Sequence, residues 1–257
     1  MSRIDGLTET EYQEVVPAGT ILLGYRGSIA HGTYLPSDNP NSIDDKDLLG
    51  VCIAELDCYF GLRKFEQREA KLREWDSVIY ELRKFAGLLL KSNPNALCLL
   101  WLEPQHYFIV EPAGRLLIDS RHLFITKRIY EAFTGYASDQ LKRMTHLAFE
   151  GYMGAKRKQL VQKHGYDTKN AAHCIRLLRM GIEFLQEGEL RVYRNDAQEL
   201  LDIKTGKYSL EQVKELAEKL FQQAQEAHER CRFPDEPDES KVNALLKQIM
   251  SAHFGVT

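Results

Sequence analysis

The stretch "GYRGSIAHGTYLPSDNPNSIDDKDLLGV", residues 24–51, joins a glycine-serine pair to a group of aspartates through a polar loop. Gly27 and Ser28 follow the apolar run "TILLGY", which is typical of a buried strand. The aspartates come just before a second run rich in branched apolar residues, "DLLGVCIAEL" at residues 47–56. The pattern therefore predicts two strands whose connecting segment carries polar groups at both of its ends.

The aspartates at the start of the second predicted strand are candidate metal ligands. Because residues two apart in a strand point to the same side, we expect Asp45 and Asp47 to face one way and Lys46 the other, with Asp44 as a bystander. Two carboxylates held close together repel each other unless a cation lies between them. Mg²⁺ prefers oxygen ligands and shares its coordination with substrate phosphates, so the pattern indicates phosphoryl or nucleotidyl transfer.

The glycine-serine pair is a candidate phosphate contact. A glycine after a strand lets the backbone approach a ligand closely, and the N-terminus of a following helix offers unpaired N–H groups to phosphate oxygens. Ser28 adds a hydroxyl donor. Each motif alone is common in ordinary turns and solvated loops. The combination of strand, Gly-Ser, spacer and Asp-x-Asp is much narrower and favours a functional site.

The composition is that of a globular protein large enough for two packed units. The chain has 257 residues, 44% hydrophobic and 28% charged, with a formal net charge of -3. No signal-like or membrane-spanning run is present, and the scattered cysteines form no C-x-x-C pair, so we expect free thiols in a soluble, cytoplasmic protein with no membrane partner. The cysteines are Cys52, Cys58, Cys98, Cys174 and Cys231.

The pattern along the chain changes from mixed to helical. Apolar residues recur at helical spacing from about Ser77 until "SNPN" ends the run, and "ALCLLWL" fits either a strand or a helix. After about residue 115 the helical pattern is nearly continuous, with a clear helix that ends at Gly188. We therefore expect an α+β protein, in which residues 1–120 form a mixed domain and residues 121–257 a helical domain.

The "GS…D-x-D" arrangement resembles the signature of the DNA polymerase beta-like nucleotidyltransferase superfamily. The local sequence is similar to that of a branch of predicted nucleotidyltransferases that includes the RNA-ligase-associated type. The matching positions are Gly27, Ser28, "AHGT" at 30–33, Asp45, Asp47, Gly50 and Val51. The resemblance continues through "WDSVIYELRKFAGLLLKSNPN", "GYASDQLKRM" and "GYDTKNAAHCIRLLRMGIEFLQEGEL" and covers most of residues 20–215. It implies a polymerase beta-like mixed sheet with flanking helices, followed by a helical domain that binds nucleotide or acceptor.

The resemblance also implies a third catalytic carboxylate on a later strand beside the first two. By position this residue is Asp76 in "REWDSVIY". Asp45, Asp47 and Asp76 would then hold two Mg²⁺ ions, which Mn²⁺ could replace. The alternative is that Asp76 caps a helix that starts at Ser77.

Further nucleotide contacts are expected from basic residues. Between Lys127 and Arg191 there are twelve Lys or Arg residues against seven Asp or Glu. Lys169, His173 and Arg176 lie at i, i+4 and i+7, so on a helix they share one face that could bind phosphates. His173 could instead be a buried, hydrogen-bonded histidine. Lys84 is a further candidate phosphate contact, with a solvated helix surface as the alternative.

The sequence thus predicts a nucleotidyltransferase that moves an NMP from an NTP to a hydroxyl acceptor and releases pyrophosphate. The resemblance implies an RNA acceptor, either a tRNA or a repaired RNA end. Nucleotidylation of a protein or small molecule remains an alternative, as does a non-catalytic nucleotide sensor. The nucleotide and the oligomeric state stay open.

Overall fold

The structure is a computed structural model that describes residue 4 and residues 6–42, 45–145 and 155–255. The chain divides into two compact units. The first comprises residues 1–30, 45–125 and 236–257, and the second comprises residues 31–44 and 126–235. Compared with the predicted division at residue 120, the polar loop goes to the helical unit and the last helix to the unit that contains the sheet.

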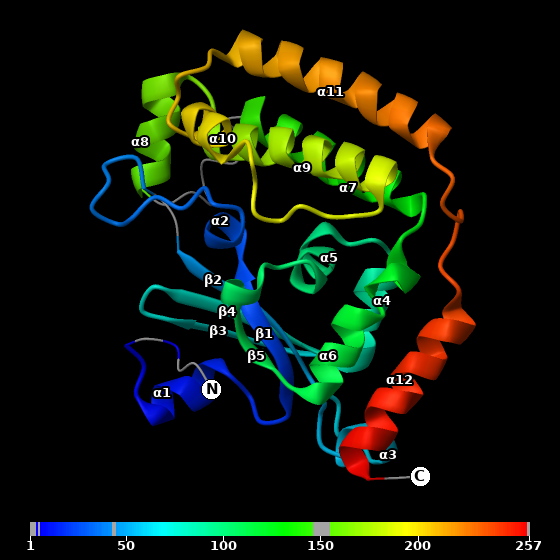
Figure 1. Cartoon of the computed structure of the whole chain (residues 1–257). Coiled ribbons are helices and arrows are strands. Elements are labelled where there is room, and N and C mark those ends of the chain that lie inside the picture. Colours follow the sequence, from blue (N-terminus) through cyan, green and yellow to red (C-terminus); the bar gives the residue numbers. More distant parts are fainter. Residues whose placement is uncertain (1–3, 5, 43–44, 146–154, 256–257) are drawn as a thin grey trace. The chain divides into compact units, whose positions relative to one another are not determined.

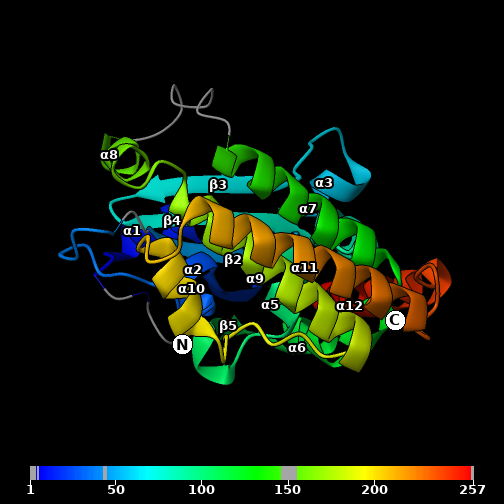
Figure 2. The same cartoon turned by 90° about the horizontal axis from the view of Figure 1, so that it is seen from above.

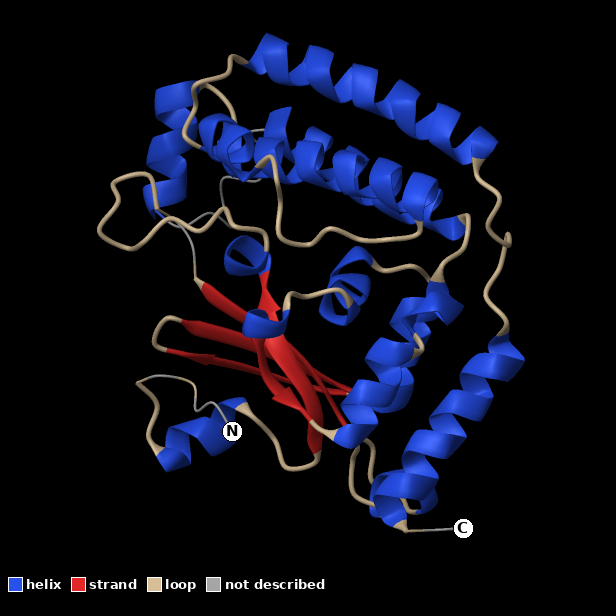
Figure 3. Ribbon diagram, in the orientation of Figure 1, coloured by secondary structure: helices blue, strands red, loops and turns tan. Residues whose placement is uncertain are grey.

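The first unit is built on a five-stranded sheet, drawn in red in Figure 3, and the sheet is mixed, as the family resemblance implies. The order across the sheet is β3-β4-β2-β1-β5, and only the β2–β4 pair is parallel. The strands are β1 (Thr20–Arg26), β2 (Lys46–Cys52), β3 (Gln67–Leu72), β4 (Trp75–Glu81) and β5 (Tyr107–Val110). Because β2 and β4 are parallel, both begin at the same edge of the sheet.

Helices flank both faces of this sheet (Figure 1). One face packs with α1 around an apolar cluster that includes Val15, Leu23, Leu48 and Ile79. Helices α4, α5 and α6 pack on the strands from the other side, and α12 packs on α4 and α6. The helices of this unit are α1 (Glu9–Val15), α2 (Gly27–Ala30), α3 (Asp57–Phe60), α4 (Leu82–Leu90), α5 (Pro94–Leu100), η1 (Pro104–His106), α6 (Pro112–Asp119), η2 (Arg121–Phe124) and α12 (Glu239–Phe254).

The expectation of a helix from Ser77 is wrong, because residues 75–81 form strand β4. Its middle is the run Ser77, Val78 and Ile79, which is buried between the parallel neighbour β2 and the antiparallel neighbour β3. The helix starts only at Leu82, where the Glu81 side chain accepts a hydrogen bond from the backbone and caps it. Tertiary pairing thus overrides the helical spacing of the apolar residues.

The second unit is helical among its described residues. Helix α9 lies at its centre and packs against α7 and α11 (Figure 2). Asp167 caps its N-terminus, and it ends at Gly188, whose φ of 71° is left-handed, which confirms the predicted stop. The helices are α7 (Arg128–Thr145), α8 (Ala155–His164), α9 (Thr168–Glu187), α10 (Ala197–Lys204) and α11 (Leu210–Arg230).

The loop that follows Ala30 is fixed within this second unit by polar contacts. The ring Nδ1 of His31 lies 2.9 Å from the carbonyl oxygen of Val192. The buried ammonium of Lys204 donates a hydrogen bond of 2.9 Å to the carbonyl oxygen of Thr33. The polar segment is therefore an integral part of the helical unit.

Two general expectations can be compared with the described part of the chain. All of the cysteines are free thiols, as predicted. Within the described residues, no helix is both long and apolar enough to cross a membrane.

Candidate active site

Four charged residues form one row across the sheet at the edge where β2 and β4 begin. Arg26 is the register partner of Asp47, Asp47 is the partner of Asp76 on the parallel strand, and Asp76 is the partner of Lys71. Directly opposite residues in a sheet point to the same face. The row therefore reads cation, carboxylate, carboxylate, cation across β1, β2, β4 and β3.

Arg26 contacts both carboxylates of the row, whereas Lys71 contacts Asp45 beside it. The Arg26 guanidinium donates a hydrogen bond of 3.2 Å to Oδ1 of Asp47 and lies 3.9 Å from Oδ1 of Asp76. Asp45 precedes β2 and accepts a hydrogen bond of 3.0 Å from the Lys71 ammonium. The side chains of Asp47 and Asp76 are 26% and 36% exposed, so solvent reaches both carboxylates.

The carboxylates shape the electrostatics of this edge. The hydrogen bond from Lys71 to Asp45 raises the pKa of the Lys71 ammonium, and the nearby charges of Asp76 and Asp47 add to the effect. Lys46 points the other way, as strand parity predicts, with its ammonium 5.1 Å from the centre of the Trp75 ring. The predicted bystander Asp44 lies outside the described residues.

The donor set suits a hard divalent cation in its chemistry. Asp45, Asp47 and Asp76 supply only carboxylate oxygens, which are the ligands that Mg²⁺ prefers. In the described part of the chain, no group of three or more Asp, Glu, His or Cys residues is gathered in metal-binding geometry. The two acids of the row are instead bridged by Arg26, and the third is held by Lys71.

Gly27 is required where it stands. Its φ of 67° is left-handed, and a Cβ there would overlap Oδ2 of Asp47 and lie 3.2 Å from its Cγ. Ser28 follows in α2, which has only four residues. The turn after β1 therefore places the Gly27 backbone directly against the Asp47 carboxylate.

Lys84, predicted as a phosphate contact, lies at the other end of β4 from the carboxylates. It is in the first turn of α4, and its ammonium is 3.1 Å from Oε2 of Glu66. Asp76 and the helix cap Glu81 are separated by roughly 17 Å at the usual rise of a strand. The position of Lys84 therefore does not support a contact with phosphates bound at Asp47 and Asp76.

The predicted basic stripe lies on α9 in the second unit. Burial and the neighbouring cations Arg176 and Lys169 hold the pKa of His173 well below its usual value of 6.5. Arg176 is 8% exposed and donates a hydrogen bond to Sδ of Met180 at 3.1 Å. His173 is therefore neutral at pH 7, so the stripe carries two charges rather than three.

Sequence reasoning missed Arg26 and Lys71, the two cations of the row. Arg26 is the last residue of β1, directly before the glycine-serine pair, and Lys71 lies in a strand of alternating burial. Neither position stands out without the strand register. Sequence reasoning also did not single out His31. Burial, and after it the nearby groups Arg176 and His173 of the same unit, keep the pKa of His31 well below 6.5.

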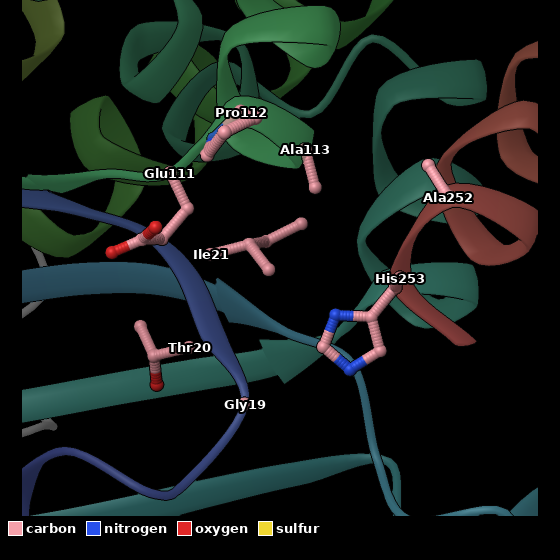
Figure 4. Close-up of a pocket in the computed structure, with 8 residues that line it drawn as sticks. All are labelled: Gly19, Thr20, Ile21, Glu111, Pro112, Ala113, Ala252 and His253. Atoms are coloured by element: carbon pink, nitrogen blue, oxygen red, sulfur yellow. The ribbon is translucent and has the colours of Figure 1, made fainter. Parts of the chain in front are cut away.

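A pocket of about 380 Å³ lies elsewhere on the first unit (Figure 4). Thr20 at the start of β1, Glu111 before α6 and His253 near the end of α12 line it. Thr20 and Arg26 stand at opposite ends of β1, roughly 20 Å apart at the usual strand rise. The pocket is therefore separate from the carboxylate row.

Comparison with known proteins adds a family match. Residues 3–248 match the sequence profile of the RlaP family, described as the RNA repair pathway DNA polymerase beta family. Among solved structures, the crystal structure of a nucleotidyltransferase-like protein from Exiguobacterium sibiricum 255-15 is 12% identical, over 86% of this chain and 73% of that chain, with a TM-score of 0.31. No curated protein matches the sequence. The family match includes residues of both units.

Proposed function

Because the chain belongs to the RNA repair pathway DNA polymerase beta family, we propose that it is a Mg²⁺-dependent nucleotidyltransferase that acts on RNA. It would move an NMP from an NTP to a hydroxyl of an RNA, such as a tRNA or a repaired RNA end, and release pyrophosphate. The observation that carries the proposal is the register that sets Asp47 directly beside Asp76 at the strand edge. Two adjacent carboxylates repel each other, and a cation-binding role would explain why they stand side by side.

Asp45, Asp47 and Asp76 are the residues that would hold Mg²⁺, with Mn²⁺ as a substitute. When bound there, Mg²⁺ would neutralise phosphate charge and lower the pKa of the acceptor hydroxyl. All three carboxylates lie on the same sheet edge, and Asp47 and Asp76 are accessible to solvent. The donor chemistry and the exposure both support this assignment.

Residues of the Gly27 turn would bind the triphosphate. The backbone of Gly27 has no side chain to keep a phosphate at a distance, and the Ser28 hydroxyl can donate a hydrogen bond. Asp76 would lie nearest the acceptor hydroxyl and accept its proton as the oxygen attacks the α-phosphorus. The pyrophosphate would leave on the opposite side of that phosphorus.

Lys169, His173 and Arg176 on α9 would contact the nucleotide or the RNA. Because the pKa of His173 is lowered, its ring would act as a neutral hydrogen-bonding group. Lys169 is partly exposed and can reach the phosphates of a ligand from the protein surface, whereas Arg176 is buried along most of its length. We therefore expect the larger share of phosphate attraction from Lys169.

The test is transfer of label from each α-³²P NTP to RNA in the presence of Mg²⁺. Asp47→Asn and Asp76→Asn should each strongly reduce transfer while they keep the melting temperature. Glu74→Gln, a neighbouring exposed acid whose partner is Lys46, is the matched control. Label on protein instead of RNA would overturn the acceptor assignment. Nucleotide binding without pyrophosphate release with any acceptor would support the sensor and overturn the enzyme.

A further inference from the structure

The row of charges across the sheet leads to an inference about how the site takes up its metal, and this inference rests on the proposed function. We propose that Arg26 and Lys71 are built-in counter-cations, which a divalent cation displaces from the carboxylates and which then contact the phosphates of the nucleotide. They would make metal binding weak in the absence of nucleotide and strong in its presence. The two side chains would thus couple metal uptake to nucleotide uptake.

The first argument is the placement of the cations. Each of the two adjacent carboxylates has the other as its partner on one side and a cation as its partner on the other side. Like charges directly opposite in a sheet destabilise it, and opposite charges stabilise it. Arg26 touches both acids of the row, and Lys71 holds Asp45. The chain has therefore placed positive charge on both flanks of its acidic pair.

The second argument is competition for the same oxygen atoms. The oxygens that accept hydrogen bonds from Arg26 and Lys71 are Oδ1 of Asp47 and Oδ2 of Asp45. A metal ion needs lone pairs of these carboxylates and is repelled by an adjacent ammonium or guanidinium. Binding of the ion therefore requires the cations to move away or to lose part of their contact.

The third argument is charge balance. Three carboxylates with two cations carry a small net negative charge, whereas the same cluster with an added divalent ion would be net positive. A nucleotide triphosphate brings several negative charges to this point. Arg26 and Lys71 carry flexible side chains with N–H donors and can turn from carboxylate to phosphate oxygens without leaving the sheet edge.

The closing experiment measures binding of Mn²⁺ alone by electron paramagnetic resonance, without nucleotide. We expect Lys71→Met and Arg26→Met each to bind Mn²⁺ on the order of tenfold more tightly than the unsubstituted protein, because one competing charge is gone. In the presence of Mn²⁺, the same variants should bind a non-hydrolysable NTP on the order of tenfold more weakly. Lys71→Arg keeps the charge and should bind Mn²⁺ as the unsubstituted protein does.

Lys84→Met is the matched control for Lys71→Met. It removes the same charge from the same unit, but its partner is Glu66 at the far end of β4, beyond a Debye length from the carboxylates at physiological salt. Its Mn²⁺ affinity should stay unchanged. Melting curves in a chelator and in Mn²⁺ provide a second readout, in which added Mn²⁺ should raise the melting temperature of Lys71→Met more than that of Lys84→Met.

The outcomes separate this inference from the proposed function. If Asp47→Asn and Asp76→Asn leave Mn²⁺ binding of the protein intact, the carboxylates are not its metal site and the proposed function fails. If they abolish it but folded Lys71→Met and Arg26→Met show no gain in Mn²⁺ affinity, only the counter-cation inference fails. Equal Mn²⁺ rescue of the melting temperature in Lys71→Met and Lys84→Met would also overturn it.

Discussion

Gly27 directly follows strand β1 and Asp47 lies in strand β2, and the Cα of Gly27 faces the Asp47 carboxylate so closely that no side chain fits between them. The left-handed φ of Gly27 would also strain any other residue. The turn that would bind phosphate and the strand that carries the carboxylate are thus fitted to each other at this one point.

Gly27→Ala should therefore impair the site and the fold together. We expect a loss of about 1–2 kcal/mol in the free energy of unfolding from the left-handed backbone alone, together with a fall in transfer rate as Asp47 is displaced. Urea unfolding and kinetics measure the two effects. Gly87→Ala in α4 is the control, because a Cβ there meets nothing within 4 Å and should be neutral or stabilising.

Asp76→Asn should separate activity from stability. We expect transfer to fall by roughly 10²–10⁴-fold, since the proposed base is lost. The free energy of unfolding should change by less than about 1 kcal/mol in either direction, because the repulsion from Asp47 and the attraction to Arg26 are removed together. A variant that is destabilised by more than this and regains activity on cooling would mark Asp76 as a structural residue.

Asp167 is expected to stabilise the second unit through two separate contacts. Its carboxylate caps α9 and lies 2.7 Å from the Arg157 guanidinium, and the side chain is almost fully buried. Asp167→Ala should lower the free energy of unfolding by about 1–2 kcal/mol through loss of the cap alone, and by more because Arg157 loses its carboxylate partner. Asp167→Asn keeps a capping oxygen, so chemical denaturation should show a smaller loss for it than for Ala.

The protein should lose stability as the pH is lowered below neutrality, because of His31 and His173. Burial, with Arg176 as a nearby cation, keeps the pKa of each ring well below 6.5 in the folded protein. Below pH 6.5 the unfolded chain therefore binds more protons, and stability is lost at up to about 1.4 kcal/mol per pH unit for each histidine. Above pH 6.5 both states are neutral and the effect vanishes.

Urea unfolding between pH 5 and pH 7.5 measures this dependence. His31→Gln and His173→Gln should each flatten the acid limb, whereas His122→Gln, on an exposed side chain, should leave its slope unchanged. An acid limb that keeps its slope in both buried variants would assign the loss to the carboxylates.

Much of the carboxylate edge could be predicted from the sequence because a strand has a period of two. That rule placed Asp45 and Asp47 on one face and Lys46 on the other without knowledge of any partner strand. The strand that carries Asp76 was harder, since Ile79, Leu82 and Phe85 follow helical spacing through both the strand and the helix after it. Only the pairing with β2 and β3 decides between strand and helix there.

The cations of the row depend on register, which no local pattern encodes. Arg26 contacts Asp47 because β1 and β2 pair antiparallel with that offset, and the pairing of β3 with β4 sets Lys71 opposite Asp76. The same limit applies to His31, whose partner Val192 is 161 positions away.

The loop between the Gly27 turn and the aspartates has a consequence for how the protein can be divided. Its ends are joined by the chain to Ala30 and Asp45 of the sheet unit, while its first residues are bound by Val192, Arg194 and Lys204 of the helical unit. A chain cut at residue 125 would keep Asp45, Asp47 and Asp76 and would lose the residues that bind the start of this loop. A chain shortened in this way would therefore lack the groups that fix His31 and Thr33, and we expect its loop between residues 30 and 45 to lose that anchorage.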